Sequence, residues 1–181
     1  MAAVVAGTLL VGACTDAPKP AAIAHVTGAN EVLIQVGDYT IGAIPDEFVV
    51  GPELIVYGDG SVYSSSSGTR TGHVTESQLQ ALLRAGEAMP ADAPVGDPAV
   101  DAVPLLVVSG THFWEINDLR VQPLMGYVGD IRSTAAVAAT AAWAPARWIV
   151  RPFGGPCTVV AEKPDLPGYY MAPVFPHLLD Q

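Results

Sequence analysis

The stretch "PELIVYGDGSVYSSS" (residues 52–66) decides the fold, because two strand-forming runs flank a short turn within it. Residues 54–57 and 61–64 are rich in side chains that favour strands, and the "GDG" of residues 58–60 separates them. Glycine readily takes the positive φ that tight hairpin turns need. The stretch therefore predicts an antiparallel β-hairpin.

A helix is predicted directly after this hairpin, in "TESQLQALLRAGEAM" (residues 75–89). Thr75 is a good N-cap, and Gln78 three residues later completes the pattern of a capping box. Proline at position 90 cannot continue the helix. Three leucines at helical spacing give it one apolar stripe: Leu79, Leu82 and Leu83.

The other predicted elements complete an α+β pattern on a mostly antiparallel sheet with about two packed helices. A second helix is expected over residues 130–144, "DIRSTAAVAATAAWA", with Asp130 as N-cap and Pro145 beyond its end. Residues 90–104 read as a loop rich in proline. Further strands are expected at residues 31–37, 105–110, 112–116, 147–153 and 157–163, with an edge strand at 168–175 that tolerates Pro173.

Length and charge limit the classes of function. At 181 residues, the chain is long enough for one domain with a real core, and we expect a single globular unit over residues 30–181. A formal net charge of -10 repels phosphate backbones, so nucleic acid is not an expected partner. No stretch reaches the ~18 apolar residues of a membrane-spanning helix.

The N-terminal segment carries the strongest functional signal. Residues 2–13, "AAVVAGTLLVGA", are apolar and small, which is typical of the core of a secretory signal. The following "VGAC" (residues 11–14) resembles the bacterial lipobox, in which the cysteine thiol receives diacylglycerol. This resemblance predicts a lipoprotein-type signal peptide at 1–13, lipidation at Cys14, and a flexible tether over residues 14–29. Residues 2–18 contain no Lys or Arg, which departs from the usual signal, and the alternative is that Cys14 is a buried thiol.

Catalytic and metal-binding motifs are not found in the sequence. There is no G-x-S-x-G, and Ser64–Ser67 read as a polar loop. Ser109 and His112 lie three residues apart without an evident third member. The four histidines are widely separated, and Asp92, Asp97 and Asp101 share one loop at a spacing that misses the alternating pattern of an EF-hand, so we expect no cofactor and no metal site. These histidines are His25, His73, His112 and His177.

Cys157 is the second thiol of the chain. If Cys14 is acylated, Cys157 has no partner and is expected to be buried at the start of a strand. If Cys14 is not lipidated, a disulfide between the two cysteines becomes the alternative.

Four stretches are similar, in order and spacing, to uncharacterised secreted or lipid-anchored proteins of actinobacteria. They are "IPDEFVVGPELIVYGDGSVY" (44–63), "TESQLQALLRAGE" (75–87), "GDPAVDAVPLLVV" (96–108) and "YYMAPVFP" (169–176). The resemblance covers residues 31–181 and rests on structural motifs. It implies a secreted or anchored protein and assigns no catalytic residue.

Three hypotheses for function follow from these patterns. The first is a non-enzymatic protein, anchored in the cell membrane through Cys14 on its extracytoplasmic face, whose domain binds a protein or another envelope component. The second is an envelope hydrolase in which His112 or His73 lies beside a carboxylate such as Glu115 or Asp118. The third is a structural envelope protein without a discrete site. A pocket joining His to carboxylate favours the second, and an exposed apolar patch favours a protein partner.

Overall fold

The structure is a computed structural model, and it confirms the hairpin predicted from residues 52–66. It describes residues 20–38, 52–65, 68–90, 105–116, 122–152, 158–163, 165 and 169–179. Strand β2 (Leu54–Tyr57) pairs antiparallel with β3 (Ser61–Ser64). In the turn, Gly60 has a φ of 90°, and the Asp59 carboxylate accepts hydrogen bonds from the Ser61 amide and hydroxyl at 2.8 and 2.9 Å.

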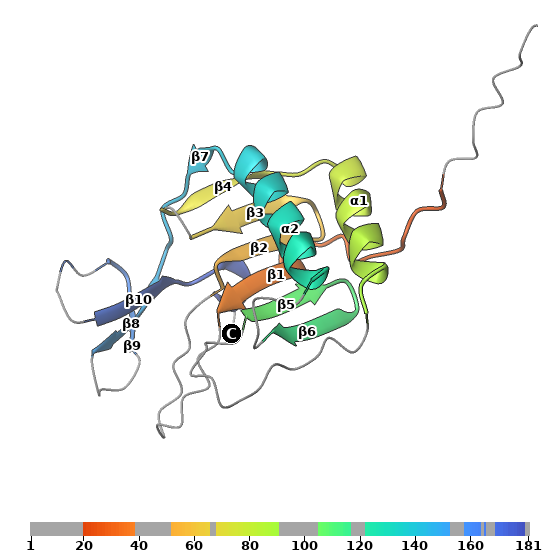
Figure 1. The fold of residues 1–181 in the computed structure, drawn as a ribbon. Coiled ribbons are helices and arrows are strands. Elements are labelled where there is room, and N and C mark those ends of the chain that lie inside the picture. Colours follow the sequence, from red (N-terminus) through yellow and green to blue (C-terminus); the bar gives the residue numbers. More distant parts are fainter. Residues whose placement is uncertain are drawn as a thin grey trace, which may run out of the picture.

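The hairpin forms part of a seven-stranded sheet with the order β6-β5-β1-β2-β3-β4-β7 (Figure 1). The strand pairs within it are antiparallel. The predicted strands at 31–37, 105–110 and 112–116 are confirmed as β1 (Val32–Asp38), β5 (Leu105–Ser109) and β6 (His112–Ile116). Strands β4 (Arg70–His73) and β7 (Ala141–Ala142) were not predicted, because neither has an apolar alternation.

The first helix agrees with its prediction. Helix α1 (Glu76–Glu87) begins after Thr75, and both halves of the Thr75–Gln78 capping box are formed. The leucine stripe is buried, together with Gln80 and Gly86. The capping box therefore fixed the start of this helix correctly, since it depends on four consecutive residues.

The prediction of a second helix at 130–144 was wrong at both ends. Helix α2 spans Leu124–Ala138, so Asp130 lies within it, and the N-cap is Pro123. Its buried face has helical spacing from the first turn onward: Leu124, Tyr127, Val128, Ile131 and Ala135. The helix ends early because Ala139 leaves helical geometry and the next residues pair with β4 as β7.

The main core lies between one face of the sheet and the two helices, which cover that face side by side (Figure 1). Leu33, Leu54, Val56 and Val62 contribute from the strands, each at most 2 % exposed. The leucine stripe of α1 and the buried face of α2 complete it. Burial of these apolar surfaces is the main favourable contribution to folding.

The C-terminal part of the chain forms a second sheet, with the order β10-β8-β9. Its strands are β8 (Trp148–Pro152), β9 (Thr158–Val160) and β10 (Tyr169–Pro173), which confirms the late strands and the edge position of β10. A short 3-10 helix follows, η1 (Pro176–Leu178). The chain is thus an α+β domain with a mostly antiparallel sheet.

The opposite face of the large sheet carries a smaller apolar cluster. Phe175 packs there with Ile55 and Tyr57, and all three are fully buried. The Tyr57 hydroxyl lies 2.8 Å from Nδ1 of His177. Burial raises the pKa of Tyr57 to about 12 and lowers the pKa of His177. Both groups are therefore neutral around pH 7, and the hydrogen bond between them joins two uncharged side chains.

Gly72 of β4 and Gly129 of α2 provide a matched test of how closely the end of α2 packs on β4. A Cβ at Gly72 would lie 1.9 Å from the Ala138 carbonyl oxygen, whereas a Cβ at Gly129 would meet nothing within 4 Å. We expect Gly72→Ala to lower the free energy of unfolding by about 2–3 kcal/mol. Gly129→Ala should raise it by about 0.5–1 kcal/mol, because alanine favours the helix. Urea denaturation followed by circular dichroism measures both, and equal effects would contradict the close approach of α2 to β4.

Candidate functional site

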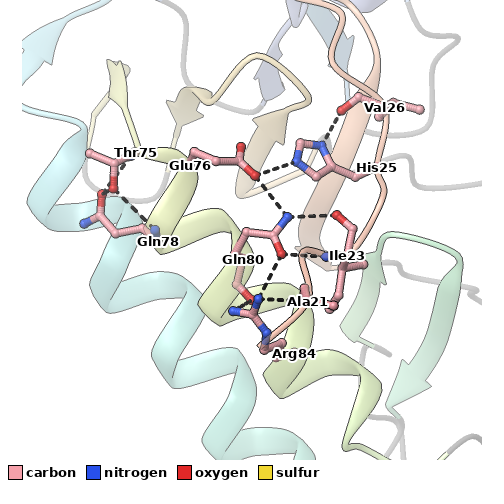
Figure 2. Close-up of polar contacts among 9 residues, drawn as sticks. All are labelled: Ala21, Ile23, His25, Val26, Thr75, Glu76, Gln78, Gln80 and Arg84. Carbon is pink, nitrogen blue, oxygen red and sulfur yellow. Dashed lines mark hydrogen bonds and ion pairs between the residues drawn. The ribbon is translucent and has the colours of Figure 1, made fainter. Parts of the chain in front are cut away.

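The N-terminal segment 20–29, which we call the strap, lies against helix α1 (Figures 1 and 2). The side chain of Gln80 pairs with both main-chain groups of Ile23: its Oε1 accepts from the Ile23 amide and its Nε2 donates to the Ile23 carbonyl, each at 2.8 Å. One side-chain amide thus replaces the neighbouring strand that an extended segment would otherwise need. Gln80 is 7 % exposed, so these bonds are largely shielded from water.

Gln80 is itself held by the residues one turn before and one turn after it. Its Nε2 also donates to Glu76 Oε1 at 3.0 Å, and Arg84 Nη2 donates to Gln80 Oε1 at 3.4 Å. Residues four apart share a helix face, so the three side chains form a single polar row (Figure 2). Arg84 Nη2 also donates to the Ala21 carbonyl at 3.0 Å. The row therefore binds the main chain of the strap at two positions.

A histidine–carboxylate pair holds the next part of the strap against α1. Nε2 of His25 lies 3.2 Å from Glu76 Oε1, and its Nδ1 contacts the Val26 carbonyl oxygen. The Val26 carbonyl and the Glu76 carboxylate raise the pKa of His25, while burial opposes them. His25 and Gln80 in turn lower the pKa of Glu76. The charged forms of both residues therefore favour the docked strap.

Beyond His25 the strap crosses the turn of the β2–β3 hairpin. A Cβ at Gly58 would lie 2.4 Å from the Val26 carbonyl oxygen, so glycine is needed for the crossing. Gly58 also donates its amide hydrogen to the Glu31 carbonyl at 2.9 Å. The described part of the segment that we expected to be a flexible tether is thus bound to the domain from Ala21 onward, because α1 and the hairpin turn satisfy its main chain.

A pocket of about 440 Å³ lies beside the strap. Its walls come from the strap, the end of α1, the start of β1 and the turn between β5 and β6. The apolar lining residues are Ile23, Ala24, Val26, Val32, Leu33 and Leu83. The polar lining residues with side chains are His25, Glu87, Ser109, Thr111 and His112. This volume and this mixture are typical of sites for small molecules.

Ser109 and His112 both reach this pocket but do not form a nucleophile–base pair. They face each other across the β5–β6 hairpin. The Ser109 hydroxyl is 2.6 Å from the Tyr127 hydroxyl in a buried hydrogen bond, and burial raises the pKa of Tyr127. The ring of His112 stacks on Trp114, with 5.4 Å between ring centroids. Both side chains are therefore engaged with aromatic neighbours.

The remaining residues singled out in the sequence lie elsewhere. Nε2 of His73 contacts the Asp59 carbonyl oxygen at 2.9 Å, beside the hairpin turn. Four strands separate β4 from β6, a distance of about 24 Å, so His73 does not lie beside β6. Within the described ranges, no three His, Cys, Asp or Glu side chains are grouped as a metal site would require. Outside the described residues lie Cys14, Cys157, Asp118, Asp92, Asp97, Asp101, Ser66, Ser67 and the side chain of Glu115.

Comparison with known proteins adds no relative: no protein family, no curated protein and no solved structure matches this chain. Among the described helices, none is long and apolar enough to cross a membrane. The site must therefore be interpreted from its own geometry.

The polar row of α1 was missed in the sequence analysis. The sequence contains a signal for it, since Glu76, Gln80 and Arg84 recur every four residues beside the leucine stripe. What they bind could not be read from that spacing, because the partner lies 57 residues away in the chain.

Replacing Gln80 should release the strap. In Gln80→Ala the Ile23 amide loses its partner, and we expect its hydrogen exchange to accelerate by roughly tenfold or more, while amides of β1 and β2 change little. Gln78→Ala is the matched control, because Gln78 lies on the same helix and, among the residues that the structure describes, its side chain hydrogen-bonds to Thr75 and not to the strap (Figure 2). Equal exchange of the Ile23 amide in both variants would contradict the role of Gln80.

The docked strap should also depend on pH. The raised pKa of His25 stabilises docking fully below its ordinary value of 6.5 and less as pH rises through the folded-state pKa. The lowered pKa of Glu76 stabilises docking above its ordinary value of 4.5 and less as pH falls through the folded-state pKa. Protection of strap amides, corrected for intrinsic exchange, should be greatest between about pH 4.5 and 6.5. In His25→Gln the loss above pH 6.5 should disappear; a persisting loss would exclude His25 as its source.

Proposed function

We propose that this chain is a lipid-anchored extracytoplasmic protein that binds a small amphiphilic component of the cell envelope in the pocket beside the strap. The observation that carries this proposal is the position of the pocket. The strap forms one of its walls, and Cys14, the expected site of lipidation, precedes the first residue of the strap by six positions in the sequence.

Chain length supports a site close to the membrane. Seven residue steps separate Cys14 from Ala21, where the docked strap begins, and they span at most about 25 Å. An acyl chain on Cys14 would thus hold the pocket near the headgroups. Stable anchoring needs two or more such chains, which diacylglycerol supplies.

The lining of the pocket supports a ligand with an apolar body and a polar head. Six apolar side chains can enclose the body, and His112, Thr111 and Glu87 provide polar groups for the head. A protein partner has less support. The large apolar side chains that are exposed in the described ranges lie on four different segments, the strap, β6, α2 and β9: Val26, Phe113, Val137 and Val159.

Native mass spectrometry of the chain, purified from the membrane fraction of its own organism, tests both parts of the proposal. The expected species begins at Cys14, carries acyl chains, and holds a further small molecule that dissociates on activation. In Cys14→Ser the protein should move to the soluble fraction. Retention of residues 1–13 with an unmodified thiol would overturn the anchor.

Two variants in which phenylalanine replaces an alanine of the strap test the pocket separately. Ala24 lines the pocket, whereas Ala22 lies on the same strap outside it, and both are exposed. We expect Ala24→Phe to fill the pocket and abolish the bound small molecule, while Ala22→Phe retains it. A ligand present at equal occupancy in the two variants, or absent from the wild type, would overturn the pocket as the binding site.

A further inference from the structure

A second cavity, of about 280 Å³, lies between the end of α2 and strands β2 to β4, away from the strap. Strand pairing aligns Leu54, Ser64 and Arg70 in one row across the sheet. Leu54 belongs to the core beneath the helices, so the row lies on the helix face. The small side chains of Ala135 and Ala139 leave open space above it.

Two of the eight basic residues of this acidic chain line the cavity. Arg132 of α2 holds the Glu53 carboxylate with two hydrogen bonds, from Nε at 3.1 Å and Nη2 at 2.6 Å. Arg70 donates from Nη1 to the Thr140 carbonyl at 3.1 Å. In the described part of the chain, its remaining N–H groups have no hydrogen-bond partner.

We propose that this cavity binds a monoanionic carboxylate with a short apolar body, and that Arg70 holds the carboxylate. A guanidinium offers a planar pair of donors that matches a carboxylate, and the Arg132–Glu53 pair displays that geometry within the same cavity. Leu54 and the alanines of α2 surround the apolar body.

The charge balance selects a monoanion over a phosphate dianion. The two guanidiniums and the Glu53 carboxylate leave the cavity with one net positive charge. The last carbonyl groups of α2 add the negative end of the helix dipole. A second negative charge on the ligand would therefore meet Glu53 and the helix end without a cation of its own.

The carboxylate could belong to a free acid or to the end of a peptide chain, and suitable probes separate these sources. N-acetylalanine represents the chain end, propionate the free acid, and N-acetylalaninamide the uncharged counterpart. Two-dimensional amide NMR titrations should give saturable shifts at Arg70 and near the end of α2 with at least one acid. Stronger binding of N-acetylalanine assigns the chain end; stronger binding of propionate assigns the free acid. The amide should give no such shifts.

Three variants test the residues that carry this proposal. Arg70→Gln should weaken acid binding by about tenfold or more. Arg147→Gln changes the net charge equally on an exposed residue outside the cavity, so it should alter binding less than about twofold. Glu53→Gln removes the competing charge and should strengthen binding about threefold, with thermal denaturation checking that the fold is kept.

Three results would overturn the site. The first is an absence of saturable shifts with either acid, and the second is equal weakening in Arg70→Gln and Arg147→Gln. The third is inorganic phosphate at pH 8 binding more tightly than both acids, since this would contradict the preference for a monoanion. The cavity and its residues are separate from the strap pocket, so these outcomes are independent of the proposed ligand beside the strap.

Discussion

The turn between β2 and β3 is the point at which the separate parts of the molecule meet. The Gly60 carbonyl accepts the Val74 amide at 2.9 Å, which sets the path from β4 into α1. The Asp59 carbonyl contacts His73, and Gly58 lies under the crossing strap at Val26. A single short turn therefore fixes the hairpin register, the entry into the first helix and the position of the N-terminal segment.

Both cavities follow from this arrangement. The strap can form a pocket wall only because the turn and α1 hold its two halves in place. On the same helix-covered face of the sheet, the close approach of Ala138 to Gly72 brings the end of α2 down onto β4. The alanines of that helix end then leave the open space that Arg70 and Arg132 both line.

Local signals made the hairpin and α1 predictable, since a glycine turn and a capping box each depend on a few consecutive residues. The start of α2 was not, because glycine at 126 and 129 weakens the helical signal while the buried face of Leu124 forms only in contact with the sheet. Strand β4 has no local signal and exists through its pairing with β3 and β7. The candidate sites depend on such distant contacts. The sequence analysis therefore singled out His25 and Ser109, but it could not show that they pair with Glu76 and Tyr127.

The strap is also a length of chain that could be released from the domain without unfolding the sheet. Gln80 and Arg84 bind its main chain, so a force applied to the N-terminal end would act on those few hydrogen bonds before it acted on the sheet. The bond from Arg84 to Ala21 lies nearer the N-terminal end than the bonds from Gln80 to Ile23, so it would break first. Peeling of residues 21–29 would lengthen the connection by up to about 30 Å while the core stayed folded. The reach of the N-terminal segment can therefore increase under force while the domain stays folded.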